Sequence, residues 1–152
     1  MTKQHSNSQS GSDEHYRCSV AIPIRYADID AHRHLNNVAY LTFMEQARLV
    51  YLREVGLWHD DRFESVGMIV AKVTCTYLQP AYMWEEVRVR IRISHVGTKS
   101  FHFEYRMETD RALVATGHSV QVCYDYYRQC SIPMPETWRE AIQAYERRPP
   151  AQ

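Results

Sequence analysis

The chain has no long hydrophobic run and no excess of charge of either sign. Its 152 residues include 18 lysines and arginines against 18 aspartates and glutamates. No overall field therefore draws it toward nucleic acid or an anionic membrane. No stretch is long and uncharged enough to cross a bilayer, and the N-terminal residues lack the apolar core of a signal peptide. We predict a cytoplasmic protein without nucleic-acid or membrane partners.

Motifs for disulfides and metals are also missing. The four cysteines are scattered without a Cys-x-x-Cys pair, which predicts reduced thiols in small core positions. The eight histidines include no His-Glu-x-x-His motif. His32 and His34 are two residues apart, a spacing that does not place both on one helix face. The sequence therefore predicts no metal site.

The length fits one domain with an ordinary core. Residues 1–15 are rich in Ser, Gln and Asn, and this composition predicts a disordered polar tail. We assign residues 16–148 to the single domain and residues 149–152 to a second short tail.

The first half of the domain contains a predicted strand, a turn and a long helix. Partial alternation predicts a strand over residues 18–26, and Pro23 indicates an edge position or a bulge. Residues 27–36 are dense in Asp and Asn, as in turns. A helix is predicted over residues 37–55, ending at Gly56.

This helix is apolar over most of its circumference, which is typical of a helix enclosed by a curved sheet. Arg48 falls inside the apolar arc, and we expect its stem to lie on the core while its head reaches a carboxylate or carbonyl. The arc is formed by Tyr40, Leu41, Met44, Ala47, Tyr51, Leu52 and Val55, widened by Phe43 and Val50.

The second half reads mostly as strand. Two-residue alternation or β-rich composition predicts strands over residues 68–78, 87–93, 101–107 and 113–127, and a short helix over residues 136–147. Arg88, Arg90 and Arg92 alternate with apolar residues and predict a solvated outer face. The fold class is α+β, with one long central helix wrapped by an antiparallel sheet of about five strands.

The segment before the long helix is the candidate for chemistry. It combines two carboxylates, Asp28 and Asp30, with two imidazoles, His32 and His34. Backbone amides in the first helical turn have no partner inside the helix, and the helix dipole favours negative charge there. A nearby carboxylate is able to attack a carbonyl polarised by such amides, or to deprotonate a water that does so. The commoner role of Asp and Asn before a helix is that of turn and cap residues.

The string YADIDAHRHLNNVAYLTFMEQARLVYL resembles the signature of the hotdog-fold acyl-CoA thioesterases of the 4-hydroxybenzoyl-CoA thioesterase family. VGTKSFHFEYRM and YDYYRQCSIPMPETWREAI extend the resemblance over residues 17–147. The resemblance implies a hotdog fold that hydrolyses an acyl-CoA thioester to free acid and CoA. It implies no cofactor, since coenzyme A belongs to the substrate, and a homodimer or dimer of dimers whose sheets join edge to edge.

The resemblance assigns the catalytic carboxylate to Asp30, as nucleophile or general base. His34 either donates a hydrogen bond to the thioester or orders the loop. The oxyanion site is expected at the backbone amide of Asn37 or a neighbour, with Asn36 and Asn37 as helix caps. Asp28 is interpreted as structural.

Other assignments are less direct. Glu45 is expected to orient the loop or to serve another subunit's site. Arg33 stands where the family commonly has glycine, so either the loop backbone suits other residues or Arg33 points outward, where a coenzyme A phosphate is one partner. Our candidates for substrate binding are Arg33 and the residues Lys99, Ser100 and Arg128.

Two alternatives to hydrolysis remain on sequence grounds. One is a hotdog dehydratase acting on a hydroxyacyl thioester, and the other is a non-catalytic module that binds an acyl thioester. One scaffold supports all three functions. The sequence leaves open the acyl group and the choice between free coenzyme A and a carrier protein.

Overall fold

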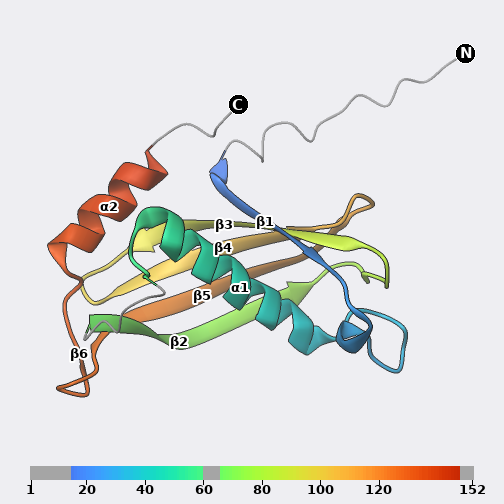
Figure 1. The fold of residues 1–152 in the computed structure, drawn as a ribbon, viewed down its shortest axis with the longest axis horizontal. Coiled ribbons are helices and arrows are strands. Elements are labelled where there is room, and N and C mark those ends of the chain that lie inside the picture. Colours follow the sequence, from blue (N-terminus) through green and yellow to red (C-terminus); the bar gives the residue numbers. More distant parts are fainter. Residues whose placement is uncertain (1–14, 60–65, 148–152) are drawn as a thin grey trace, which may run out of the picture.

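The computed structural model describes residues 15–59 and 66–147. One long helix lies across a face of an antiparallel sheet, and a shorter helix packs near one end of it (Figure 1). The predicted tails, residues 1–15 and 149–152, lie outside the described residues apart from His15. None of the helices in the described ranges has the length and apolar character needed to cross a membrane.

The sheet has the strand order β1-β3-β4-β5-β2, and β6 pairs with β5. The alternation in the sequence therefore predicted the main strands, and β1 is at an edge as Pro23 indicated. The predicted first strand is too long, because the chain turns into the short 3₁₀ helix η2 (Tyr26–Asp28). The strands are β1 (Cys18–Pro23), β2 (Val66–Tyr77), β3 (Glu86–Val96), β4 (Ser100–Glu108), β5 (Leu113–Asp125) and the unpredicted β6 (Cys130–Ser131).

Helix α1 (Asn37–Val55) has the predicted limits because both of its ends carry local signals. At the start, the side chain of Asn36 accepts a hydrogen bond from the amide of Val38. At the end, Gly56 adopts φ 84°, and its amide donates to the carbonyls of Leu52 and Arg53.

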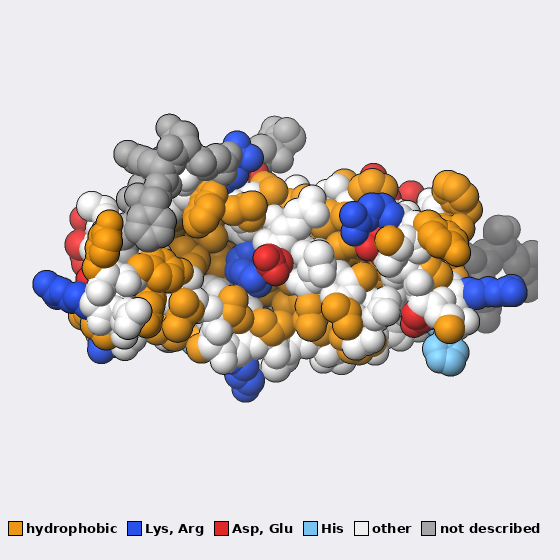
Figure 2. Space-filling view, turned by 60° about the horizontal axis from the view of Figure 1, so that its bottom comes forward, with side chains coloured by type: hydrophobic (Ala, Val, Ile, Leu, Met, Phe, Trp, Pro, Cys, Tyr) orange, Lys and Arg blue, Asp and Glu red, His pale blue; other side chains and the backbone are white. Residues whose placement is uncertain are grey.

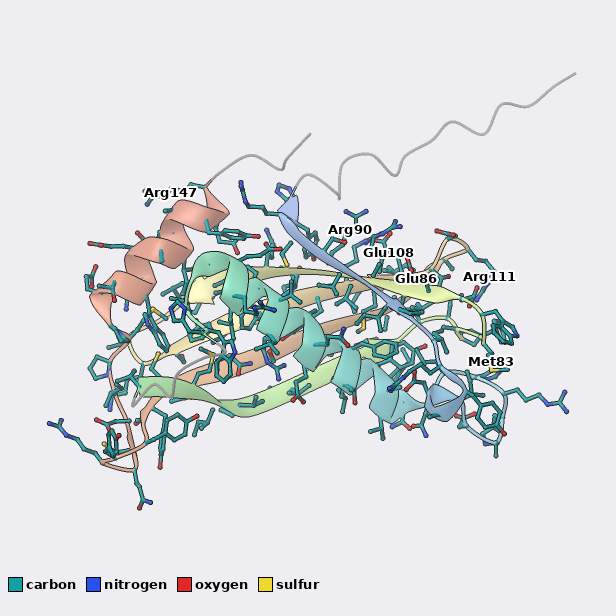
Figure 3. All side chains as sticks on the ribbon, in the orientation of Figure 1. Met83, Glu86, Arg90, Glu108, Arg111 and Arg147 are labelled. Atoms are coloured by element: carbon teal, nitrogen blue, oxygen red, sulfur yellow. The ribbon has the colours of Figure 1, made fainter. Side chains whose placement is uncertain are left out.

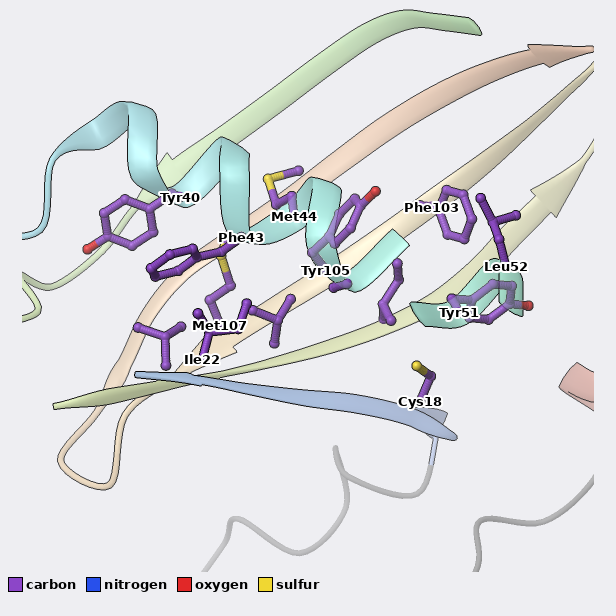
Figure 4. Packing of buried hydrophobic residues seen from close by; sticks show 14 of the residues in the cluster. Cys18, Ile22, Tyr40, Phe43, Met44, Tyr51, Leu52, Phe103, Tyr105 and Met107 are labelled. Carbon is purple, nitrogen blue, oxygen red and sulfur yellow. The ribbon is translucent and has the colours of Figure 1, made fainter. Parts of the chain in front are cut away.

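The core lies between α1 and the inner face of the sheet. Phe43 and Met44 of the helix lie beside Tyr105 and Met107 of β4 (Figure 4). The apolar circumference is not fully enclosed, however. Leu41, predicted to lie in the buried arc, is 38% exposed, and Leu49 is 41% exposed. The sheet therefore covers one side of α1 and leaves apolar residues open on another.

The outer face of the sheet is polar, as the arginine alternation predicted. Arg90 of β3 lies beside Glu108 of β4 with 3.3 Å between Nε and Oε1 (Figure 3). Cys18 and Cys123 are buried as predicted, but the expectation of a core position for Cys130 is wrong, because Cys130 follows an exposed turn.

Helix α2 (Glu136–Glu146) is fastened to the core by buried tyrosines. The hydroxyl of Tyr51 donates to the Glu146 carboxylate, which also accepts the amide of Ile93 at 2.8 Å. Tyr145 donates to Glu54 of α1 in the same way. These bonds cross between two helices and one strand, so they fix where α2 sits.

We predict that Tyr51→Phe lowers the free energy of unfolding by about 1 to 3 kcal/mol, because the Glu146 carboxylate loses a donor in a partly buried setting. Chemical denaturation measures the change. The matched control Tyr82→Phe, at an exposed tyrosine, should change stability by less than about 0.5 kcal/mol. Equal effects of the two variants would contradict the fastening role.

Candidate active site

The loop before α1 is closed by backbone hydrogen bonds. The amide of Asp30 donates to the carbonyl of His34 at 3.0 Å, and Ile29 forms an isolated bridge with Leu35. Two further bonds tie the loop to other segments: Leu35 donates to the carbonyl of Ala81 at 2.8 Å, and Asn36 to that of Asp28 at 2.7 Å. The loop is therefore a fixed platform in front of the helix.

One oxygen of the Asp30 carboxylate accepts hydrogen bonds from the loop backbone. Its Oδ1 accepts the backbone amides of His32 at 2.8 Å and His34 at 3.4 Å. Its Oδ2 has no hydrogen-bond partner among residues 15–59 and 66–147. The side chain is only partly buried. One oxygen thus orients the group, while the other is available to a ligand.

An unpaired backbone amide lies at the start of the helix. The amide of Val38 is capped by Asn36 Oδ1 at 3.0 Å, and that of Ala39 donates to the Asn36 carbonyl at 2.9 Å. Within the described part of the chain the amide of Asn37 has no acceptor. The predicted cap role is confirmed for Asn36 and is wrong for Asn37, which is the first residue of the helix. The Asn37 amide is open at the positive end of the helix dipole.

Asp28 is buried and acts as a brace for the loop. Its carboxylate accepts Arg25 Nη2 at 2.8 Å and the Arg25 backbone amide at 2.9 Å. The hydrogen bond from the Arg25 side chain holds the pKa of the Asp28 carboxyl below its usual value, against the opposing effect of burial. The Asp28 carboxylate is therefore engaged by Arg25, which agrees with the structural role predicted for Asp28.

His34 and Arg33 occupy different settings in the same loop. The His34 ring is partly buried and meets the edge of Tyr82, with 5.3 Å between ring centroids. Arg33 is exposed and has φ 65°, a left-handed conformation that favours glycine. The expectation of a loop backbone suited to non-glycine residues is thus wrong, whereas the outward direction of Arg33 is confirmed.

The other predicted binding residues lie at the opposite end of the sheet. Ser100 pairs with Val122, which pairs with Ile69 near the start of β2. Asn37 instead accepts a hydrogen bond from Tyr77 at the end of β2. Eight residues of extended strand separate these points, or roughly 26 Å. A single chain therefore does not bring this second group together with Asp30.

Lys99 and Arg128 flank that distant end. Lys99 Nζ lies 3.4 Å from the carbonyl oxygen of Ser131, and Arg128 Nε lies 3.8 Å from Asp125 Oδ2. Both side chains are at the surface. Their predicted role in binding the substrate remains a prediction.

A cavity of about 700 Å³ opens between α1 and the first half of β2. Its wall is formed by α1 between positions 42 and 52, β2 between positions 66 and 70, and Gln121, Tyr126 and Trp138 among others. Most of this wall is apolar. Of the predicted site residues only Glu45 lines it, and Glu45 is exposed.

A buried polar network borders the cavity. Arg48 Nη1 donates to the Tyr105 hydroxyl at 3.2 Å, which lies 2.8 Å from Ser119 Oγ. Gln121 Nε2 also donates to Ser119 Oγ at 2.8 Å. The expected carboxylate or carbonyl partner of Arg48 is wrong, since its partner is a hydroxyl.

This network was not predicted from the sequence, although a signal exists in β5. Ser119 and Gln121 pair with Phe103 and Phe101, whose side chains face the core. Extending the alternation along the predicted strand would have placed two polar residues at core-facing positions. Buried polar groups at such positions are bonded to one another or face a ligand.

Chemically, the loop and helix start offer a carboxylate oxygen and a backbone amide from the same few residues. This pair is suited to an electrophilic carbon whose oxygen gains negative charge. Among the described residues no group of three or more His, Cys, Asp or Glu side chains is arranged to hold a metal ion.

The chain is similar in sequence to known thioesterases. The family described as the Thioesterase-like superfamily matches residues 24–142. The long-chain acyl-CoA thioesterase FadM of Escherichia coli K12 is 24% identical over 129 residues, covering 80% of this chain and 94% of FadM. The uncharacterized protein YsmA of Bacillus subtilis 168 is 26% identical over 84 residues, so the match spans only about half of that protein, 56% of its length.

A solved structure gives the same result for the fold. The structure described as a thioesterase complexed with coenzyme A and Zn, from Thermus thermophilus, has a TM-score of 0.78 and 30% identity. The match covers 90% of this chain and 98% of that one. The predicted hotdog fold and thioesterase family are confirmed.

The backbone conformation of Arg33 leads to a testable difference between two substitutions. Arg33→Gly should raise the free energy of unfolding by up to about 1 kcal/mol, because glycine adopts positive φ without strain. Arg33→Val removes the same charge but should lower stability, because a β-branched residue is disfavoured there. Thermal unfolding followed by circular dichroism measures both, and a more stable valine variant would contradict the strain.

Proposed function

The chain belongs to the thioesterase-like superfamily, and from this membership and the loop geometry we propose that it hydrolyses an acyl-CoA thioester to a free acid and coenzyme A. The observation that carries the proposal is that Asp30 Oδ2 and the Asn37 amide, both unpaired within the described residues, belong to one closed loop and the helix start that follows it. The name of FadM supports acyl-CoA as the substrate class.

In the proposed reaction the thioester oxygen accepts a hydrogen bond from the Asn37 amide. The helix dipole and this donor stabilise the negative charge that develops on the oxygen. Asp30 Oδ2 either attacks the carbonyl carbon, expelling the coenzyme A thiolate and leaving an anhydride for water to cleave, or deprotonates a water that attacks. Either route consumes one water and releases acid and thiol.

Exposed apolar residues on an edge strand of the sheet support a dimer. Strand β2 is an edge of the sheet, and Ile69, Val70 and Val73 on it are exposed. Figure 2 views this side and shows hydrophobic side chains along the whole face, with a basic and an acidic side chain near its middle. An exposed apolar edge strand is suited to pairing with another strand.

We propose that two copies pair through β2, antiparallel about a two-fold axis near the middle of the strand. Such pairing places Tyr77 and Asn37 of one copy next to the start of β2 in the other. The cavity, Lys99 and Arg128 of the second copy lie at that end. The dimer thus accounts for the separation of Asp30 from the cavity within one chain.

We predict that Asp30→Asn lowers kcat for release of thiol from acyl-CoA by about a hundredfold to ten-thousandfold. The asparagine oxygen still accepts the amides of His32 and His34, so the fold and circular dichroism should not change. A thiol-trapping assay over short, long and aryl acyl-CoA thioesters measures the rate. Asp110→Asn, at an exposed turn aspartate, is the matched control, and full activity of Asp30→Asn would end the proposal.

The dimer leads to a separate prediction. Val73→Lys places a charge on the exposed face of β2 and should convert a species of about twice 18.0 kDa into one of 18.0 kDa. Size-exclusion chromatography with light scattering measures the mass. Tyr127→Lys, an exposed aromatic beyond β5, should leave the dimer intact. A monomeric wild-type chain would show that β2 does not pair.

A further inference from the structure

The cavity beside α1 contains an arginine without an acidic partner. Arg48 lines its wall, and the only hydrogen bond of its head within the described residues is to the Tyr105 hydroxyl at 3.2 Å. Among residues 15–59 and 66–147, no carboxylate lies within ion-pair distance of the Arg48 guanidinium. Glu45, one helical turn away, is exposed at the surface. A guanidinium has five donors, so most of its capacity is unused.

Other half-buried arginines of the protein are paired. Arg92 lies 2.8 Å from Glu104, and Arg106 lies 2.6 Å from Glu108. These pairs lie on the solvated outer face, where water already screens charge. Arg48 faces an apolar cavity instead, where an unpaired charge is more costly. Arg48 therefore lacks an acidic partner at the position where an unpaired charge is most costly.

The neighbours of Arg48 do not neutralise it. Tyr105, Ser119 and Gln121 are each 1% exposed and form one hydrogen-bonded chain. Burial raises the pKa of Tyr105, although Arg48 and the bond with Ser119 partly oppose this effect. The phenol therefore remains neutral at ordinary pH. The network holds the guanidinium in place without supplying negative charge.

We propose that Arg48 receives a carboxylate carried by the acyl group, so that the preferred substrate is the thioester of a dicarboxylic acid. The apolar wall from Leu49, Leu52, Met68 and Val70 accommodates the hydrocarbon part of the acyl chain. The far carboxylate meets Arg48 in charge-assisted hydrogen bonds. This inference rests on the proposed hydrolase function and names the substrate class of that site.

The first test compares matched substrates with the wild-type protein. The pairs are adipoyl-CoA with hexanoyl-CoA, suberoyl-CoA with octanoyl-CoA, and dodecanedioyl-CoA with dodecanoyl-CoA. For the length that spans the cavity, kcat/KM should favour the dicarboxylic member by about tenfold to a hundredfold, the usual worth of a hydrogen bond to a charged group. Equal or faster cleavage of every monocarboxylic member would overturn the inference.

Variants assign the preference to one side chain. Arg48→Met keeps the length of the side chain and removes the charge, so the preference ratio should fall to about one, whereas Arg48→Lys should retain part of it. Arg53→Met, on the same helix but outside the cavity wall, should keep the full ratio. A full ratio in Arg48→Met would contradict the role of Arg48, and the wild-type comparison decides the matter if that variant does not fold.

Calorimetric binding of a free ligand pair separates this inference from the hydrolase proposal. Octanoate, which carries a carboxylate, should bind to the wild-type protein more tightly than the neutral octanamide, and Arg48→Met should abolish the difference. If this pattern holds but no acyl-CoA is cleaved, the hydrolase proposal fails and the carboxylate site stands. If acyl-CoA is cleaved but the two ligands bind equally, hydrolysis stands and the carboxylate site is wrong.

Discussion

The geometry of the candidate site depends on how the loop before α1 is held. Its backbone is bonded to itself at Asp30 and His34, to Ala81 in the connection between β2 and β3, and to Asp28. Because these bonds fix the loop against the helix start, Asp30 and the Asn37 amide have a set relation before any substrate arrives. Preorganised groups of this kind need no rearrangement when charge develops, and this is the main source of electrostatic stabilisation in catalysis.

Local signals explain what was predicted from the sequence. The limits of α1 follow from Asn36 and Gly56, whose effects are local. The strands follow from alternation. The strained backbone of Arg33 was not predicted, because it depends on the closure of the loop and not on the residue itself. The cavity was not predicted either, since Arg48 and its partner Tyr105 are 57 residues apart and no local pattern links them.

The exposed apolar residues on one side of the molecule relate the candidate site to the proposed dimer. The sheet covers α1 on one side only, which leaves Leu49 of the helix exposed, and Val73 of the edge strand β2 is exposed as well. In the proposed dimer, a second copy on this edge would bury these residues and bring the loop of one chain to the cavity of the other. This dimer would give one explanation for the exposed apolar surface, the distance between the two groups of candidate residues and the uncompensated charge of Arg48, namely a substrate bound between two chains.

The most direct measurement is a crystal structure with a non-hydrolysable acyl-CoA analogue, such as one in which an amide replaces the thioester. We expect the carbonyl oxygen within about 3 Å of the Asn37 amide nitrogen, with Asp30 Oδ2 facing the carbonyl carbon. An analogue bound with its carbonyl away from the helix start, or with Asp30 turned from it, would contradict the proposed mechanism.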